Sequence, residues 1–214
     1  MSFLWTLLAF CVLAPIGLPA SAADAPVRIV ALGDSLTAGF GLAAEEAFPN
    51  QLQRALETAG YAVTIANAGV SGDTASAGLA RLDWSVPEGT EAVILELGAN
   101  DALRGVDPSV TRKALDAILT RLAARNIPVL IAGMRAPPNM GEDYAQRFDA
   151  IYPELAAKHG ALLYPFFLDG VATEARLNQQ DGMHPTAAGV RAIVEAILPQ
   201  AQELVRRALG RRGS

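Results

Sequence analysis

Residues 27–36, VRIVALGDSL, lead from an apolar run straight into a cluster of small and polar residues, and this stretch decides the fold. Val27–Leu32 shows little polar alternation, as is typical of a parallel strand that is covered on both faces. Four more short apolar runs follow at near-regular intervals: Val63–Ala66, Ala92–Leu97, Val129–Met134 and Leu162–Phe167. The pattern predicts a parallel sheet of five strands.

Helical patterns separate these runs. Asp107 precedes Pro108, which is the usual order of a capping residue and a proline in the first helical turn. After them, an apolar residue recurs at every fourth position and predicts one inward stripe: Val110, Ala114, Ile118 and Leu122. Alternating strands and helices belong to the α/β class, and we expect a three-layer α/β/α sandwich with right-handed crossovers.

Two other helix ends can be placed. Gly60 is expected to end the helix that precedes the second apolar run. A last helix is expected from about Thr186, and Pro199 should kink or break it. Its inward face is predicted to carry four apolar residues: Val190, Ile193, Val194 and Ile197.

The composition limits the possible functions. The chain is 51% hydrophobic and 18% charged, which excludes a wholly disordered protein. The net charge is −5 and Lys113 and Lys158 are the only lysines, so a basic face that binds nucleic acid is not expected. We expect the C-terminal cluster of Arg206, Arg207, Arg211 and Arg212 to be a solvated tail.

The N-terminal segment has the layout of a secretory signal peptide. Residues 1–22 carry no charged side chain, and an apolar run at Leu4–Leu13 precedes the small residues Ala20-Ser21-Ala22. The run is too short to cross a bilayer, which needs about 20 apolar residues. We expect cleavage before Ala23, a single domain over residues 23–214 without a membrane span, and export to the periplasm or the medium.

Cys11, the only cysteine, lies inside the predicted signal peptide. The mature chain would then have no disulfide, no thiolate nucleophile and no cysteine ligand for a metal. Asp34, Asp73, Asp101 and His184 do not have the spacing of a known metal motif, so no metal site is expected.

Polar residues and glycines gather where the predicted strands end. They lie in four stretches, at residues 33–36, 67–74, 98–101 and 181–185. Ligands of open parallel sheets bind outside the carboxyl ends of the strands. These four loops therefore predict the functional site.

A serine, a histidine and an aspartate in these loops fit nucleophilic catalysis. Asp181 lies three residues before His184, so its carboxylate can accept the Nδ1 proton and leave Nε2 as a base toward Ser35. The alternative is that Asp181 and His184 only cap their loop. The other histidine, His159, precedes Gly160 at a predicted helix end and is expected to have a capping or surface role.

Three donors are candidates for an oxyanion hole: the Ser35 N–H, the Gly72 N–H and the Asn100 side-chain amide. The alternative for Gly72 is an ordinary turn glycine, and for Asn100 a loop cap. Asp34, Asp73 and Asp101 are expected to brace the loops by accepting hydrogen bonds from backbone N–H groups.

These residues resemble the four sequence blocks of the GDSL, or SGNH, hydrolases. The blocks are Gly33-Asp34-Ser35-Leu36, Gly72, Gly98-x-Asn100-Asp101 and Asp181-x-x-His184. The stretches between them resemble the bacterial periplasmic thioesterase I, lysophospholipase and arylesterase branch, notably at residues 71–74, 78–82, 95–98 and 150–153. One departure is Ala99, which stands where this branch often has a second glycine.

The resemblance implies a flavodoxin-like sheet in the order 2-1-3-4-5 and a serine hydrolase without a cofactor. It implies Ser35 as the nucleophile, His184 as the general base and acid, and Asp181 as the residue that orients the histidine. Gly72 and Asn100 would complete the oxyanion hole with the Ser35 N–H.

The substrate is expected to be a small acyl or aryl ester or a thioester, hydrolysed by a monomer. In the related enzymes the loop after the fourth strand lines the acyl pocket, and we expect Pro138 and Met140 to do so here, unless they only shape a surface loop. Arg104 and Arg135 are candidates for contacting an anionic leaving group, and the alternative for each is a solvated loop charge. A carbohydrate O-deacetylase and a non-catalytic ligand-binding α/β module remain as alternatives.

Overall fold

A computed structural model describes residues 25–212, so the predicted signal peptide at residues 1–22 lies outside the described part of the chain. The strands are β1 (Val27–Gly33), β2 (Val63–Gly69), β3 (Ala92–Glu96), β4 (Val129–Ala132) and β5 (Leu162–Tyr164). All neighbouring strands are parallel, and the order is β2-β1-β3-β4-β5. The expected sheet and its order are confirmed.

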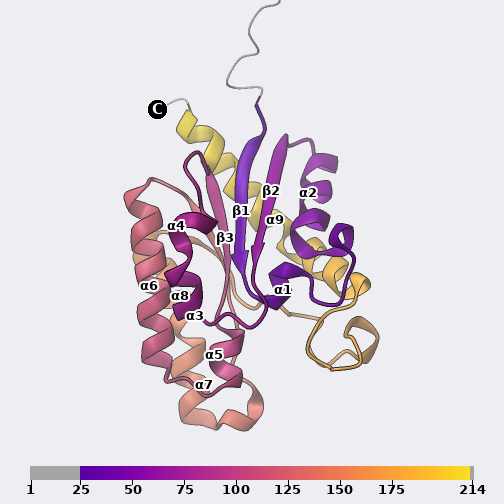
Figure 1. Ribbon diagram of the computed structural model, residues 1–214, viewed down its shortest axis with the longest axis vertical. Helices are drawn as coiled ribbons and strands as arrows, with labels where there is room; N and C mark the ends of the chain where they lie inside the picture. The colour runs from indigo at the N-terminus through magenta and orange to yellow at the C-terminus, as the bar shows by residue number, and fades with distance from the viewer. Residues whose placement is uncertain (1–24, 213–214) are drawn as a thin grey trace, which may run out of the picture.

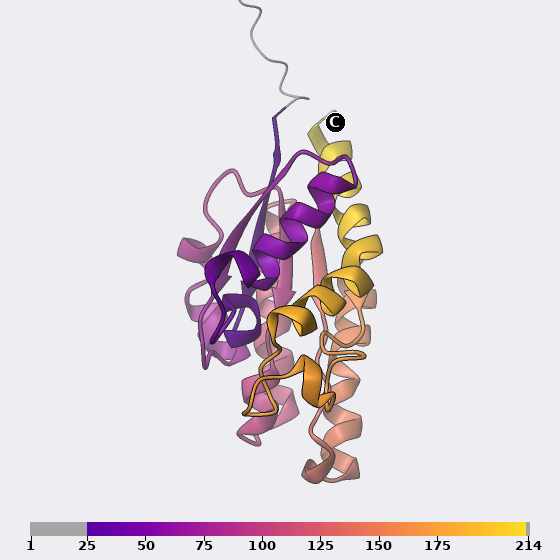
Figure 2. The same ribbon diagram turned by 90° about the vertical axis from the view of Figure 1, so that its right-hand side faces the viewer.

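Helices cover both faces of the sheet and form a three-layer sandwich (Figures 1 and 2). One face carries α2 (Phe48–Thr58) and α9 (Ala187–Arg212), and the other carries α3 (Ala75–Ala80), α6 (Pro108–Ala124) and α8 (Ile151–His159). The remaining elements are short: α1 (Ser35–Ala38), α4 (Leu82–Ser85), α5 (Ala99–Leu103), α7 (Glu142–Asp149), η2 (Ala44–Glu46), η3 (Pro138–Met140) and η4 (Ala175–Leu177).

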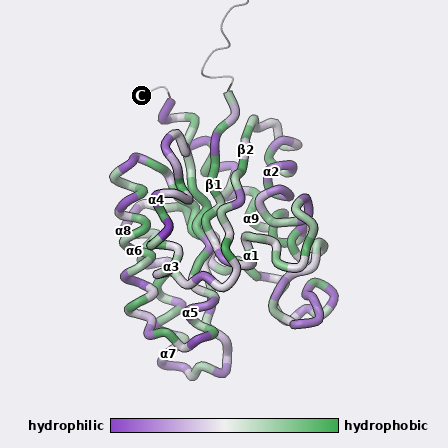
Figure 3. The backbone as a smooth tube through the Cα atoms, in the orientation of Figure 1, coloured by the Kyte–Doolittle hydropathy of each residue, from purple (hydrophilic) through white to green (hydrophobic). Residues whose placement is uncertain are grey.

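The central strands are buried on both faces, but an edge strand is not. Every residue of β3 and β4 is buried, and so is every residue of β1 except Arg28. In β2, by contrast, Thr64 and Ala66 are exposed, because this strand has no neighbour on one side and one of its faces is open. Figure 3 shows the hydrophobic residues concentrated along the inner strands and the hydrophilic ones on the outer turns.

Helix α6 begins as expected but buries a different stripe. Asp107 accepts a hydrogen bond from the Ser109 N–H at 2.8 Å and caps the helix. Val110, however, is 47% exposed, and the prediction for it is wrong. Successive steps of four residues rotate by about 40° around a helix of 3.6 residues per turn, so a spacing of four leaves the buried face. The buried residues are Pro108, Thr111, Ala114, Leu115, Ile118, Leu119 and Leu122.

Helix α9 continues through Pro199 instead of breaking there, and Figure 2 shows its axis turning along its length. The expected inward residues, Val190, Ile193, Val194 and Ile197, are all buried. Gly60, with φ of +91°, follows α2 at the expected position. None of the helices within residues 25–212 is long and apolar enough to span a membrane.

The C-terminal arginines are not a solvated tail, contrary to the expectation. Arg212 pairs with the Glu91 carboxylate at 2.6 Å and donates to the backbone carbonyls of Ala25 and Pro26. Arg207 donates to the Gly160 carbonyl at 2.9 Å. These contacts tie the end of α9 to the amino end of the sheet, where the described chain begins (Figure 1).

Candidate active site

The loops at the carboxyl ends of the strands bring Ser35, His184 and Asp181 into one hydrogen-bonded line. Ser35 is the first residue of α1, directly after β1 and the capping residue Asp34. Its Oγ lies 2.9 Å from His184 Nε2, and His184 Nδ1 lies 2.7 Å from Asp181 Oδ2. This is the geometry of a serine whose proton can pass to a histidine held by a carboxylate.

Asp181 is held as a carboxylate by its own loop. Its Oδ1 accepts hydrogen bonds from the backbone N–H groups of His184 at 3.0 Å and Met183 at 2.9 Å. These bonds, together with the one from the His184 ring, lower the pKa of Asp181 to about 2. An ionised carboxylate can only accept, so the proton of the His184–Asp181 contact is on Nδ1 and Nε2 is free to take the Ser35 proton.

Residues that sequence analysis missed hold the histidine in place. The ring of Phe40 lies against the His184 ring, with centroids 4.5 Å apart. Gln179 ties the two loops together, because its Nε2 donates to the Phe40 carbonyl at 2.7 Å and its N–H donates to the His184 carbonyl at 2.7 Å. Gln179 and Phe40 are 139 residues apart, and no local pattern indicates that they meet.

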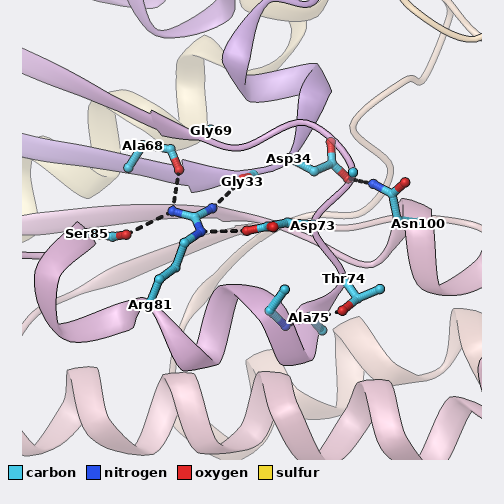
Figure 4. Close-up of polar contacts among 12 residues, drawn as sticks. Gly33, Asp34, Ala68, Gly69, Asp73, Thr74, Ala75, Arg81, Ser85 and Asn100 are labelled. Carbon is cyan, nitrogen blue, oxygen red and sulfur yellow. Dashed lines mark hydrogen bonds and ion pairs between the residues drawn. The ribbon is translucent and has the colours of Figure 1, made fainter.

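The three candidate donors of the oxyanion hole border the same cavity as Ser35 Oγ. Gly72 has φ of +87°, a conformation that favours glycine, and its carbonyl accepts a hydrogen bond from Arg104 at 2.8 Å. Asn100 Nδ2 donates to Asp34 Oδ2 at 3.1 Å (Figure 4). The N–H groups of Ser35 and Gly72 have no acceptor within residues 25–212. Both are therefore available to a ligand.

The loop aspartates differ in what they bind. The expected backbone contacts are confirmed for Asp34, which accepts from the Leu36 N–H at 3.0 Å, and for Asp101, which accepts from the Ala75 N–H at 2.8 Å. For Asp73 the expectation is wrong, because its carboxylate pairs with Arg81 at 2.6 Å.

Arg81 is a buried arginine at the junction of β1, β2 and the loop that carries Gly72. Besides Asp73, it donates to the carbonyls of Gly33 and Ala68, both at 2.8 Å, and to Ser85 Oγ at 2.9 Å (Figure 4). Sequence analysis missed it because arginine is usually exposed.

Glu96, the last residue of β3, is fully buried beneath the turn that carries Ser35. Its Oε2 accepts from the Thr37 hydroxyl at 2.7 Å and from the Asp34 N–H at 3.3 Å. Burial raises the pKa of Glu96 well above its usual range, and burial also raises that of Asp34 to about 6. An acidic residue inside the apolar run Ala92–Leu97 was the signal that could have singled it out.

A mostly apolar cavity of about 740 Å³ opens beside Ser35. Pro138 lines it, as expected, but Met140 does not and lies next to Gly105 instead. Arg135 is at the wall with its guanidinium 5.1 Å from the centre of the Phe166 ring. Other apolar lining residues include Leu36, Leu103, Met134, Leu168 and Met183.

The remaining candidates are His159, Ala99 and a metal site. His159 lies on α8 with Nε2 2.6 Å from Asp116, away from the cavity. Ala99 does not have a positive φ, so alanine is accommodated there without backbone strain. The residue of this loop that has a positive φ is Gly98, which precedes α5. In the part of the chain that the structure describes, no group of three or more His, Cys, Asp or Glu side chains is arranged to hold a metal ion.

Comparison with known proteins agrees with this geometry. The sequence model of the GDSL-like lipase/acylhydrolase family matches residues 31–192. The chain is 38% identical to an arylesterase of Vibrio mimicus over 87% of this chain and 92% of that protein. It is 37% identical to the thioesterase 1/protease 1/lysophospholipase L1 of Escherichia coli K12 over 87% of each.

A solved structure is also similar. The SGNH-hydrolase family esterase AlinE4 is 48% identical, with a TM-score of 0.71 over 83% of this chain and 96% of that one. The chain therefore belongs to the GDSL-like lipase/acylhydrolase family and is an enzyme that hydrolyses ester bonds.

Proposed function

We propose that Ser35, His184 and Asp181 are the catalytic residues of a serine esterase for small acyl and aryl esters. The observation that carries this proposal is the line of contacts Ser35 Oγ–His184 Nε2–Asp181 at 2.9 Å and 2.7 Å, at the wall of an apolar cavity. In it, Ser35 is the nucleophile, His184 the general base and acid, and Asp181 the group that orients the histidine.

The reaction begins when Ser35 Oγ attacks the ester carbonyl while its proton moves to His184 Nε2. The carbonyl oxygen becomes an oxyanion that accepts hydrogen bonds from the N–H groups of Ser35 and Gly72 and from the Asn100 amide. When the C–O or C–S bond to the leaving group breaks, His184 returns the proton to the alcohol or thiol. The acyl group then remains bonded to Ser35.

Water completes the cycle in the reverse sense. His184 removes a proton from a water molecule as it attacks the acyl-enzyme, and the second oxyanion occupies the same hole. The bond to Ser35 Oγ then breaks, Oγ recovers the proton from His184, and the carboxylic acid leaves. Asp181 stays ionised throughout, since its low pKa keeps the proton on the imidazole.

The cavity supports acyl and aryl groups as the substrate class. Its wall is mainly apolar and Pro138 is part of it, so a hydrocarbon chain or an aromatic ring would be buried there on binding. Thioester and lysophospholipid hydrolysis are extensions of the same chemistry, supported by the name of the Escherichia coli relative.

Covalent labelling tests the catalytic assignment. A fluorescent organophosphonate should attach to Ser35, and Ser35→Ala should abolish both labelling and the hydrolysis of p-nitrophenyl butyrate. His184→Ala should lower kcat by a factor of about 10³ or more. His159→Ala is the matched control and should keep wild-type kcat, because His159 lies outside the cavity. A His184→Ala variant with kcat within tenfold of wild type would refute the triad.

A series of p-nitrophenyl esters of increasing chain length tests the substrate class. We expect butyrate to octanoate to be hydrolysed with a higher kcat/KM than acetate, because each buried CH₂ contributes about 0.8 kcal/mol to binding. A sharp optimum at acetate without hydrolysis of octanoate would favour the O-deacetylase alternative.

We also propose that the protein is exported as a monomer after removal of residues 1–22. The uncharged apolar segment and the small residues before Ala23 support this. N-terminal sequencing of protein from the periplasm or the medium should begin at Ala23, and light scattering should give the mass of one chain. An unprocessed cell-bound chain would contradict the export proposal, and a dimer mass would contradict the monomer.

A further inference from the structure

Phe40 is an aromatic residue whose position burial does not explain. It lies in the loop between α1 and η2 and is 51% exposed. Its ring nevertheless packs against the His184 ring, with centroids 4.5 Å apart and planes inclined by 35°. Two rings at this distance and angle do not lie side by side in one plane, so the contact is made through a ring face.

Hydrogen bonds hold the backbone of Phe40 on both sides. Its N–H donates to the Ser35 carbonyl at 3.1 Å, and its carbonyl accepts from Gln179 Nε2 at 2.7 Å. The flanking glycines, Gly39 and Gly41, have φ of +81° and +75°, so the chain turns on either side of Phe40. The place of the ring is therefore set by the turn that carries the nucleophile and by Gln179.

Gln179 connects Phe40 to the loop of the catalytic histidine. Its Nε2 also donates to the Pro185 carbonyl at 3.0 Å, and its N–H donates to the His184 carbonyl at 2.7 Å. A Cβ atom at position 41 would overlap Gln179 Oε1, so the approach of this side chain requires a glycine there. These contacts keep the Phe40 and His184 rings together without burying Phe40.

The other contacts of the imidazole are made at its nitrogen atoms. Nδ1 lies 2.7 Å from Asp181 Oδ2, and Nε2 lies 2.9 Å from Ser35 Oγ. Phe40 thus contacts His184 without competing with Asp181 or with Ser35. Its ring remains in place while a proton moves to Nε2.

His184 becomes positively charged twice in the proposed reaction. In acylation the O–H bond of Ser35 breaks and an N–H bond forms at Nε2, and in deacylation the proton comes from water. An aromatic ring attracts a cation within about 6 Å of its centroid, and Phe40 lies within this range of the imidazole. The attraction is stronger for the imidazolium than for the neutral ring, which is the condition for a contact to accelerate a reaction.

We propose that Phe40 is a positioning residue that stabilises the protonated form of His184: its ring, held in place by Gln179 and the Ser35 carbonyl, attracts the imidazolium formed in both proton transfers and lowers their barriers. This inference rests on the proposed triad of Ser35, His184 and Asp181. Phe40 exchanges no proton and acts on the reaction only through His184.

Fluorination of the ring separates its charge distribution from its packing. Pentafluorophenylalanine at position 40 keeps an apolar ring of similar shape but reverses the ring quadrupole. We expect kcat for p-nitrophenyl butyrate to fall about three- to tenfold, with KM changed less than about twofold. Active sites are counted by titration with the organophosphonate, so kcat refers to folded enzyme. A pentafluoro protein with wild-type kcat would overturn the inference.

Two natural substitutions test the same point. Phe40→Tyr keeps the aromatic face, so kcat should stay within about twofold of wild type. Phe40→Leu keeps an apolar side chain but removes the face, so kcat should fall about tenfold. Equal kcat values for Phe40→Tyr and Phe40→Leu would show that the aromatic ring has no role beyond its volume.

Trp84→Leu is the matched control for loss of an exposed aromatic residue. Trp84 lies on α4, is 73% exposed and does not line the cavity, so kcat and KM should both stay at the wild-type values. A loss of kcat in Trp84→Leu as large as in Phe40→Leu would make the effect a general one and refute the role of Phe40.

Failure of this inference is distinguishable from failure of the proposed function. A wild-type protein that neither hydrolyses esters nor labels at Ser35 would refute the proposed function and this inference with it. An active, labelled wild type whose kcat is insensitive to fluorination at position 40 would refute only the role of Phe40.

Discussion

Asp181 shows how a residue receives its role from the groups around it. Two backbone N–H groups and one imidazole N–H converge on its carboxylate, and this set lowers its pKa to about 2. The side chain therefore stays charged near neutral pH. A group that can only accept a hydrogen bond from Nδ1 holds the His184 tautomer that presents Nε2 to Ser35.

Replacing Asp181 by asparagine keeps the size of the side chain but removes the charge. We expect kcat for p-nitrophenyl butyrate to fall about 10²–10⁴-fold, because an amide can donate to Nδ1 and so favour the wrong tautomer. Asp83→Asn, at an exposed ion pair with Arg121, is the matched control and should leave kcat unchanged. Retention of more than a tenth of wild-type kcat by Asp181→Asn would show that the tautomer is held by other groups.

At the scale of elements, Arg81 joins parts of the fold that are distant in sequence. It follows α3 and contacts the ends of β1 and β2 through the Gly33 and Ala68 carbonyls, while its ion pair with Asp73 holds the loop after β2. All its partners are largely removed from water. The buried guanidinium therefore holds the turn that carries Ser35 and the loop that carries Gly72 in fixed positions relative to each other.

Removing the guanidinium should destabilise the fold strongly. Arg81→Met leaves Asp73 and two carbonyls without their partner, and we expect the free energy of unfolding in urea to fall by about 3–5 kcal/mol. Arg121→Met breaks an arginine–aspartate pair whose side chains are 47% and 75% exposed. This substitution should change the free energy of unfolding by less than about 1 kcal/mol. Equal effects of the two substitutions would contradict the importance of burial here.

Across the whole molecule, the carboxyl pKa values are shifted in opposite directions at the two ends of the sheet. The carboxyl end holds Asp34 and Glu96, whose pKa values are raised by burial. The amino end holds Glu91, whose pKa is lowered chiefly by its hydrogen bonds with Arg212. A carboxyl group with a raised pKa, such as that of Asp34, stabilises the folded state at low pH, and this stabilisation is lost as the pH rises through the raised pKa. A carboxyl group with a lowered pKa, such as that of Glu91, stabilises the folded state above pH 4.5, and this stabilisation is lost as the pH falls through the lowered pKa.

The contact between the two chain ends should therefore depend on pH. Arg212→Ala removes the ion pair with Glu91, and we expect Tm at pH 7 to fall by about 2–4 °C, the equivalent of about 1 kcal/mol. At pH 3 the decrease should be smaller, because protonated Glu91 no longer forms the pair in wild type. Arg112→Ala at the exposed pair with Glu154 should have a smaller effect at pH 7. Thermal unfolding at both pH values decides this, and a decrease that grows at pH 3 would contradict it.

Much of the fold was predictable because its signals are local. The apolar runs indicated each strand, and Asp107 and Gly60 indicated helix ends, since capping and burial on both faces depend on residues close in sequence. Val110 shows the limit of such patterns. A stripe at a spacing of four does not say which side of the helix the sheet will cover, and here α6 turns Val110 outward.

The reactive residues of the candidate site were predictable from the sequence, but the residues that hold them in place were not. Ser35, Asp181 and His184 stood out because reactive residue types at strand ends are few. Arg81, Phe40 and Glu96 did not, because their roles depend on partners that are far away in the chain, 62 residues in the contact of Glu96 with Asp34. The expectation of a solvated tail for the C-terminal arginines was wrong for the same reason.

By itself, the sequence of this protein determined the order of strands and helices and the reactive groups at the strand ends, because strand burial, capping and loop chemistry are encoded over a few residues. Only the tertiary structure decided that Ser35 Oγ and His184 Nε2, 149 residues apart, lie 2.9 Å from each other. It also decided that Glu96 is buried against Asp34, because desolvation depends on everything that packs around a carboxyl group and on no single neighbour in the chain.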